Sequence, residues 1–396
     1  MRLFSRRTQW DLCENPLSLE LDRMRAAGVP FFDLTESNPT RAGLLAPQDT
    51  LLAPLLDPVN LRYDPHPKGM LSARLAVARY YAAKGIQVPV EHIILTSGSS
   101  EAYTFLFRLL MDPHDRILLP VPGYPLFSYL AGLNDVETVF YRLCFDGESW
   151  RIDFDFLRQA ARRGAKAVVL VSPNNPTGSC VRPGEIALLN TLCTDMGMAI
   201  ISDEVFADYV FDRVRTPCPS LAANTGALSF ALGGLSKALA LPQMKMGWIA
   251  VNGPADEVAE ALSRLEVIAD TYLSVNTPVQ HASAVWLQAR EAISAPVMAR
   301  VRSNYGHLLA AAAVAGVQVL PVEGGWYAVL RTEMGMPGDV WALKLLEQRH
   351  VFVHPGFFFD FEEEDFFVLS LLPQEDVFRE GVAALFSFTG AQAAGR

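Results

Sequence analysis

The stretch AKAVVLVSPNNPTG (165–178) runs from a continuously apolar, β-branched segment into a turn of Pro, Asn and Gly residues. Continuous hydrophobicity is typical of a strand that is buried on both faces. Comparable short runs occupy residues 92–96, 116–120, 136–141, 198–202, 227–232 and 247–251. Amphipathic stretches with helical spacing, such as residues 99–111, lie between several of them. We therefore predict an α/β fold with a mostly parallel seven-stranded sheet sandwiched by helices.

The segments outside this region predict a second, smaller α+β unit. A helix is expected near residues 16–27, a long helical stretch at 278–315 and another helix at 340–350. Strands are expected within 318–331, at 351–353 and at 366–371. The first 45 residues precede the sheet and would fit against either unit. We place a large domain at residues 46–285 and a small domain at residues 1–45 plus 286–396.

The composition excludes several classes of protein. The chain has 396 residues, of which 51% are hydrophobic and 19% are charged, which is unlike a disordered protein. The 33 Lys and Arg residues against 43 Asp and Glu residues give a net charge of −10, so we expect no nucleic-acid partner. The mean hydropathy of +0.19 indicates a large interior rather than a membrane protein, because no apolar stretch approaches the ~20 residues of a membrane span.

Cysteine and histidine usage predicts neither a disulfide framework nor a metal site. The five cysteines contain no CxxC pair, and the seven histidines are scattered. The N-terminal stretch has arginines but no apolar core of the kind that a signal peptide carries, so we expect a cytoplasmic location.

Two predicted strands are followed by small polar residues that could bind a ligand. Ser99 and Ser100 open a helix after residues 92–96, and a helix N-terminus is suited to a phosphate group. An ordinary N-cap would use the same residues. Asn175 lies between two prolines after residues 165–171, where a rigid turn would hold its amide in one place, although a simple turn also favours these residues.

Two further strands end in ionisable residues. Asp203 follows residues 198–202, and a buried carboxylate there is costly unless a cation or hydrogen-bond donors meet it, as a structural salt bridge would. Lys237 lies in the apolar segment GGLSKALALP (233–242). Desolvation lowers the pKa of a lysine, and an amine that forms a Schiff base as a nucleophile needs such a lowered pKa. A structural lysine would instead extend its charged amine to solvent.

These features together predict pyridoxal 5′-phosphate as the cofactor. The carboxyl ends of parallel strands meet at one edge of a sheet, so the helix start, Asn175, Asp203 and Lys237 should lie together. The cofactor's aldehyde would react with the lysine, its phosphate would bind at the helix start, and its protonated ring nitrogen would face the aspartate.

The motifs SPNNPTG, SDEVFADY and SKALALPQMKMGW resemble those of the class I/II aminotransferases, which are fold type I pyridoxal-phosphate enzymes. They occur in the family's order and spacing, and the resemblance covers nearly the whole chain. It implies that Lys237 forms the Schiff base and moves the proton of the reaction. It also implies that Asp203 pairs with the pyridine nitrogen and that Asn175 bonds the cofactor's O3′ atom.

The resemblance also implies further contacts to the cofactor. Ser99, Ser100 and Ser236 would bind the phosphate, and Tyr124 in VPGYPLF would stack on the ring. Tyr63 in YDPHPKG is similar to the tyrosine that reaches the phosphate of the neighbouring subunit, although its spacing to the following Gly is one residue longer. A homodimer with shared active sites is implied.

Four positions depart from the family pattern. Phe206 replaces the usual tyrosine, so the O3′ atom loses one donor and we expect a raised pKa for the Schiff base. Lys245 replaces an arginine that faces the phosphate, which keeps the charge but not the bidentate geometry. Ser37-Asn38-Pro39 replaces Gly-x-Pro, and Val368 replaces the arginine that binds the substrate carboxylate.

The missing arginine requires another partner for a substrate carboxylate. Arg331, which ends the segment GGWYAVLR, is the first candidate and Arg41 the second, with Asn38 as a further substrate-binding candidate. A surface position would equally explain either arginine.

The leading prediction is an aminotransferase that moves an amino group between an α-amino acid and a 2-oxo acid through a lysine Schiff base. A β-eliminating carbon–sulfur lyase, or another enzyme that forms a Cα carbanion, keeps the same cofactor and is the alternative. A non-catalytic pyridoxal-phosphate sensor is a third possibility, but such regulators carry an added DNA-binding domain. The amino donor is not readable from these residues.

Overall fold

The computed structural model describes residues 3–332 and 335–394. Its centre is an eight-stranded sheet with the order β2-β9-β8-β7-β6-β3-β4-β5. The strands are β2 (Ile93–Thr96), β3 (Arg116–Val121), β4 (Glu137–Phe145), β5 (Trp150–Ile152), β6 (Ala165–Val171), β7 (Ala199–Asp203), β8 (Ser229–Gly234) and β9 (Gly247–Asn252). All seven predicted strands are present.

The sheet is mostly parallel, as predicted. Strands β4, β3, β6, β7 and β8 pair in parallel, while β9 runs antiparallel between β8 and β2. The short strand β5 was not predicted and adds an eighth member at the edge. It has three residues and pairs with β4 at the edge of the sheet, so it presents too little periodicity to be recognised in the sequence.

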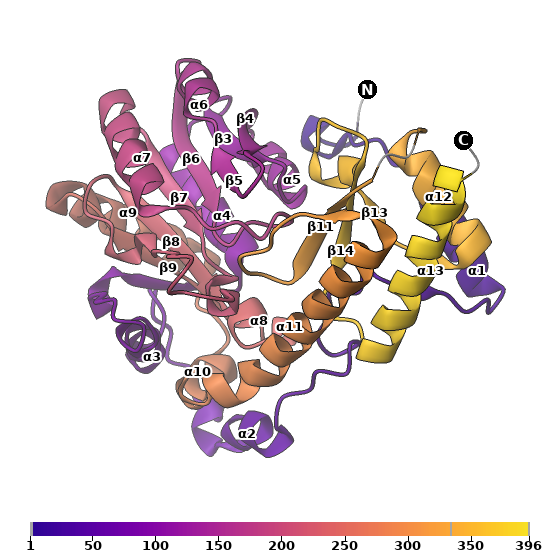
Figure 1. Ribbon diagram of the computed structural model, residues 1–396. Coiled ribbons are helices and arrows are strands. Elements are labelled where there is room, and N and C mark those ends of the chain that lie inside the picture. The colour runs from indigo at the N-terminus through magenta and orange to yellow at the C-terminus, as the bar shows by residue number, and fades with distance from the viewer. Residues whose placement is uncertain (1–2, 333–334, 395–396) are drawn as a thin grey trace.

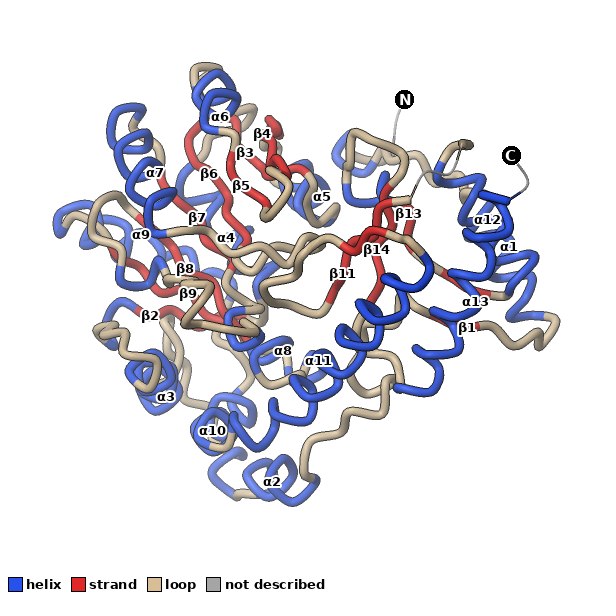
Figure 2. The backbone as a smooth tube through the Cα atoms, viewed as in Figure 1, coloured by secondary structure: helices blue, strands red, loops and turns tan. Residues whose placement is uncertain are grey.

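Helices cover both faces of this sheet, as Figures 1 and 2 show. Alternate strand residues such as Ile201 and Phe230 pack beneath α4 (Ser99–Leu110), α5 (Leu126–Leu133) and α9 (Ala255–Tyr272). Their neighbours Ile200 and Ala231 face the opposite layer. That layer contains α3 (Leu71–Ala82), α6 (Phe154–Ala161), α7 (Pro183–Met196) and α10 (Thr277–Gln288). Because both faces are covered, the central strands β6, β7, β8 and β9 are almost wholly buried, whereas the edge strand β4 has several exposed residues.

The smaller unit contains a four-stranded sheet with the order β10-β11-β14-β13. Its strands are β10 (Gln318–Val319), β11 (Tyr327–Arg331), β13 (His354–Pro355) and β14 (Phe366–Ser370). A separate parallel pair joins β1 (Phe32–Asp33) to β12 (Val351–Phe352). The packed helices are α1 (Pro16–Ala26), α11 (Arg290–Ala315), α12 (Gly338–Arg349) and α13 (Glu375–Ala394).

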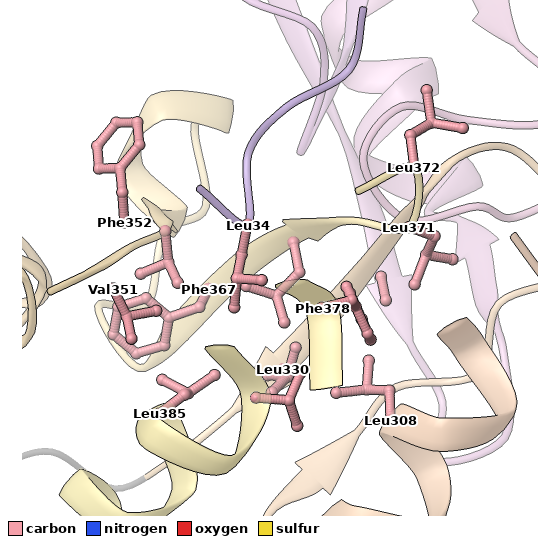
Figure 3. Packing of buried hydrophobic residues seen from close by; sticks show 14 of the residues in the cluster. Leu34, Leu308, Leu330, Val351, Phe352, Phe367, Leu371, Leu372, Phe378 and Leu385 are labelled. Atoms are coloured by element: carbon pink, nitrogen blue, oxygen red, sulfur yellow. The ribbon is translucent and has the colours of Figure 1, made fainter. Parts of the chain in front are cut away.

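Both chain ends share one hydrophobic core in this unit. Leu34 from the N-terminal segment lies among Leu308 of α11, Leu330 of β11 and Phe378 of α13, as Figure 3 shows. Helix α11 spans the two units, because Ile293 belongs to the core beneath the large sheet and the later residues of α11 to this one. The domain boundaries at residues 46 and 285 stay a prediction.

Short elements complete the described chain. They are α2 (Gln48–Leu52), α8 (Leu235–Ala238) and the 3-10 turns Arg6–Thr8, Ala53–Leu56, Pro58–Leu61, Val90–His92, Ala207–Tyr209, Leu221–Ala223, Pro242–Met244 and Gly356–Phe359. Within residues 3–332 and 335–394, no helix has the length and apolar character to span a bilayer. The same residues bring together no group of three metal-ligating side chains. The cytoplasmic location stays a prediction.

The shared core of the small unit yields a test of stability. Leu308→Ala should lower the free energy of unfolding by about 2–5 kcal/mol, because Leu308 is fully buried and its loss leaves a cavity. Leu309→Ala on the same helix is the matched control, since Leu309 is 42% exposed and its truncation should change stability by less than about 0.5 kcal/mol. Denaturant unfolding of both variants measures the difference, and equal losses would contradict the packing described.

Candidate active site

A pocket of about 230 Å³ lies where β2, β6, β7 and β8 end. Ligands of open α/β sheets bind beyond the carboxyl ends of the strands, so its position is the expected one. Seven of the eleven site residues predicted from the sequence line it: Ser99, Ser100, Tyr124, Asn175, Asp203, Ser236 and Lys237. The structure thus brings together residues that are separated by up to 138 positions in the chain, from Ser99 to Lys237.

One wall of the pocket is the N-terminus of helix α4. Ser99 and Ser100 are its first two residues, and no side chain of the described residues caps this end of the helix. The preceding Ser97 N–H donates to the Glu101 carboxylate at 2.6 Å, which orients the loop. An uncapped helix start that faces a pocket offers backbone donors and a positive dipole end to an anion.

The base of the pocket, next to the start of α4, has no room for a side chain at position 247, which is a glycine. A Cβ atom there would lie 3.0 Å from the backbone of Gly98 and 3.0 Å from the Gly233 carbonyl oxygen. Gly98 and Gly234 both line the pocket. The backbones of β2, β8 and β9 therefore approach closely at the pocket, and a side chain at Gly247 would push the segments that carry the serines and Lys237 apart.

Lys237 enters the pocket from α8, directly after β8. Its Nζ atom lies 4.8 Å from the centroid of the Trp326 ring and 5.6 Å from that of Phe206. Burial lowers the pKa of Lys237 to about 8, although the charge of Asp203 acts in the opposite direction. The Tyr209 hydroxyl donates to the Lys237 carbonyl oxygen at 2.9 Å and fixes the main chain. The amine is therefore held in place and is easily deprotonated.

Asp203 ends β7 and is 6% exposed. Its carboxylate accepts hydrogen bonds from the Tyr103 hydroxyl and from the Val205 N–H, each at 3.2 Å. Burial raises the pKa of Asp203 to about 6, while these two bonds and Lys237 lower it. A cation beside Asp203 would relieve this cost.

The neighbouring Glu204 points to the other side of the strand end, since successive side chains alternate. It accepts bonds from the Leu221 N–H at 2.7 Å and from the Ser202 hydroxyl at 3.0 Å. Burial raises the pKa of Glu204 as well. Neither of these partners lines the pocket, so Glu204 and Asp203 have different hydrogen-bond partners although they are adjacent in the chain.

Asn175 follows β6 and is 7% exposed. Its side-chain oxygen is buried, and among the described residues it has no hydrogen-bond partner. A buried amide oxygen without a hydrogen-bond partner is unusual in a folded protein. This orphaned group faces a pocket and therefore indicates that a ligand with polar atoms belongs there.

Aromatic residues form the wall opposite the strand ends. Phe206 contacts the Trp326 ring at 5.3 Å and the Tyr327 ring at 6.3 Å between centroids. Burial raises the pKa of Tyr327 to about 12, and a hydrogen bond with Ser37 lowers it. Ser37, Phe206 and Tyr327 line the pocket, so the small unit supplies two hydroxyl groups to the site and the loop after β7 supplies an apolar ring.

Four predicted residues do not line this pocket: Asn38, Tyr63, Lys245 and Arg331. Tyr63 is 73% exposed and Lys245 is also exposed. The Asn38 side-chain oxygen accepts bonds from the Thr40 N–H and hydroxyl at 3.0 and 2.7 Å, so it stabilises a turn.

Arg331 lies away from this pocket, and its role in substrate binding stays a prediction. Its guanidinium pairs with Glu363 at 2.7 Å and Asp365 at 2.8 Å, and it lines a different pocket between β4 and the 360–366 turn. Strand β11 points Arg331 toward this acidic turn. Arg41, the second candidate, is exposed and does not line the pocket. The described residues that line the pocket include no arginine.

Val368 stands where the family pattern has an arginine, and it is fully buried among Trp150, Phe361 and Phe366. The position is therefore part of an apolar cluster between β14 and the β4–β5 hairpin. A charged side chain there would be desolvated against aromatic rings.

Sequence reasoning missed several site residues, among them Ser37, Tyr103, Tyr209 and Tyr327. Tyr209 is the last residue of the motif SDEVFADY, which also contains Asp203. This closeness in the sequence was the signal that could have identified Tyr209. Tyr103 lies four residues after Ser99, so helical spacing places it on the same face as the helix start. Ser37 begins the segment that replaces the family's Gly-x-Pro, which was the available signal, whereas no local pattern indicates that Tyr327 of the small unit reaches the sheet.

Comparisons with known proteins agree with this arrangement. The family model described as "Aminotransferase class I and II" matches residues 33–384. The glutamate-pyruvate aminotransferase AlaA of Haemophilus influenzae is 26% identical to this chain over 98% of each protein. The alanine aminotransferase of Mycobacterium tuberculosis is 29% identical over 70% of this chain and 65% of its own length. The crystal structure of an aminotransferase from Escherichia coli is 25% identical and superposes with a TM-score of 0.85 over 98% of each chain.

The raised pKa of Asp203 yields a prediction about stability and pH. Above pH 6 the folded, ligand-free protein holds an ionised buried carboxylate, whereas the unfolded chain ionises with the ordinary pKa of 3.8. Asp203→Asn should therefore raise the free energy of unfolding by roughly 1–3 kcal/mol at pH 8. This increase in stability should disappear as the pH falls from 6 to 4, because the Asp203 carboxyl group of the folded wild-type protein then becomes neutral as well.

Urea unfolding of the ligand-free protein at pH 4, 6 and 8 measures this effect. Asp195→Asn is the control, since Asp195 is an exposed aspartate of α7. A loss of stability in Asp203→Asn at pH 8 would contradict the electrostatic cost assigned to Asp203.

Proposed function

The chain belongs to the class I and II aminotransferases and is a transaminase that acts on an amino acid and a 2-oxo acid, and from this premise we propose that its pocket holds pyridoxal 5′-phosphate. The observation that carries the proposal is that Asp203 and Lys237 enter the same pocket from the ends of the adjacent strands β7 and β8. This cofactor, when bound, supplies an aldehyde that reacts with a lysine amine and a ring that withdraws electrons.

The residues of the pocket fit the polar groups of that cofactor. The uncapped start of α4, with Ser99 and Ser100, suits its phosphate. The buried Asp203 carboxylate suits a protonated ring nitrogen, whose positive charge would offset the cost of burying the carboxylate. Asn175 has a buried side-chain oxygen without a partner, and its amide suits the phenolic oxygen of the ring once the group is turned to donate.

Lys237 is the group that we propose to move the proton of the reaction. Its pKa near 8 leaves a useful fraction of the amine unprotonated at neutral pH, so it can accept a proton and return it. The Tyr209 hydroxyl holds the Lys237 carbonyl oxygen, and the Phe206 and Trp326 rings flank the Nζ atom. These contacts keep the amine oriented and exclude water from one side of it.

We also propose that the protein works as a homodimer. Leu56, Leu61 and Tyr63 are 81%, 89% and 73% exposed, which is unusual for neighbouring large apolar side chains. A second copy that covers this segment would bury it. Tyr63 would then be available to the phosphate in the pocket of the other subunit.

The transaminase assignment is tested at Lys237. Lys237→Ala should lower the rate of amino transfer from alanine or glutamate, with 2-oxoglutarate or pyruvate as acceptor, by about 100- to 10,000-fold. Borohydride treatment should attach a pyridoxyl group to Lys237 in the wild type and to no lysine in the variant, as peptide mass spectrometry would reveal. Lys166→Ala, at an exposed lysine of β6, should retain the wild-type rate.

Two results would contradict this proposal. One is wild-type activity in Lys237→Ala. The other is release of ammonia from a β-substituted amino acid without any 2-oxo acid acceptor, since that reaction would identify the lyase.

The dimer is tested at the exposed segment. Sedimentation velocity should find a dimer, and Leu61→Glu should shift it toward monomer because a buried charge weakens an apolar interface. Tyr63→Phe should remain dimeric but bind the cofactor about tenfold more weakly, the cost of one hydrogen bond to a charged group. Tyr272→Phe, another partly exposed tyrosine, is the control. A fully active monomer would contradict the proposal.

A further inference from the structure

Two cysteines lie together behind the active site. Cys180 follows β6 in the loop that begins with Ser172, and Cys218 lies in the loop after β7. The Ser172 hydroxyl joins the two segments, because it accepts a bond from the Val181 N–H at 3.0 Å and lies 3.3 Å from the Cys218 Sγ atom. Cys180 directly precedes Val181, so the Ser172 hydroxyl connects the residue next to Cys180 with the Cys218 thiol.

The two thiols differ in their access to solvent. Cys180 is 2% exposed, whereas Cys218 is partly exposed and lines a pocket of about 280 Å³ with Ser172, Glu204 and Arg213. This pocket is separate from the one that holds Lys237, and it is wide enough for a small reactant. A reagent in solution therefore meets Cys218 first, and Cys180 stands behind it.

The two thiols also differ in acidity. The hydrogen bond from Cys180 lowers the pKa of Cys218, with smaller contributions from Ser172 and Arg213, whereas burial and Glu204 act against them. The same hydrogen bond raises the pKa of Cys180, and burial adds to this effect. The thiolate is the reactive form of cysteine, so the more accessible thiol is also the more readily ionised one.

We propose that Cys180 and Cys218 are an oxidation site that a hydroperoxide converts into an intramolecular disulfide. The Cys218 thiolate attacks one peroxide oxygen, the O–O bond breaks, and a sulfenic acid and a hydroxide are formed. The Cys180 sulfur then attacks the Cys218 sulfur, and the sulfenic oxygen leaves as water. Overall, two thiols and one hydrogen peroxide give one disulfide and two waters, so the peroxide is reduced and the thiols are oxidised.

The bond would tie together two loops that build the active site. The first loop carries Asn175, five residues before Cys180, and the second carries Phe206 and Tyr209, which contact Lys237. A covalent link between the loops restricts their relative movement. Oxidation would thereby reach the pocket without modifying any residue that lines it.

The experiment uses the full chain with Cys13→Ser and Cys144→Ser, because these two cysteines are exposed and would otherwise react. Treatment with hydrogen peroxide should remove two of the remaining three thiols. Mass spectrometry of a non-reduced digest should find the peptides of Cys180 and Cys218 linked, and dithiothreitol should separate them.

Single substitutions in the same background distinguish the roles of the two sulfurs. Cys180→Ser should accumulate a sulfenic acid at Cys218 that dimedone captures, whereas Cys218→Ser should give neither the link nor the dimedone adduct. Cys193→Ser should leave the link unchanged, since Cys193 is buried elsewhere in the chain. The proposal is overturned if both thiols stay free after treatment, or if Cys218 is oxidised to the sulfinic acid in the presence of Cys180 without a link.

Discussion

Two desolvated charges of opposite sign define the centre of this molecule. Strands β7 and β8 lie side by side in parallel, and their carboxyl ends bring Asp203 and Lys237 into one pocket. Burial raises the pKa of the first to about 6 and lowers that of the second to about 8, while each charge partly stabilises the other. Without a ligand the pocket therefore carries an electrostatic cost, which a cationic ring beside Asp203 and an electrophile at Lys237 would remove.

The surrounding structure keeps these two groups in place. Tyr103 reaches Asp203 from α4, and Tyr209 holds the main chain of Lys237. Glycine at Gly247 lets three strands approach closely, so the start of α4 is held near both charges. The small unit adds Tyr327 and the Trp326 ring. The site is thus assembled from the large sheet, one helix end and the small unit, and each part depends on the packing of the others.

Much of this arrangement was predictable from the sequence, for identifiable reasons. Seven continuously apolar runs indicated the strands because both faces of the sheet are covered, and the polar residues that follow them indicated the pocket. The short strand β5 was not predicted, because three residues are too few to show an alternating hydrophobic pattern. The ion pairs of Arg331 with Glu363 and Asp365 were not predictable, because they depend on the path of a turn that is distant in the sequence and that no local pattern reports.

The sequence by itself determined the sheet, the family, and the residues at the strand ends, since hydrophobic continuity and motif spacing are local properties. Only the tertiary structure decided which groups share the pocket. It placed Phe206 and Trp326 against Lys237 and buried Val368 in an apolar cluster. It also brought Cys180 next to Cys218. These contacts join segments far apart in the chain, and their geometry follows from how the two units pack, which burial of apolar surface determines and sequence spacing does not record.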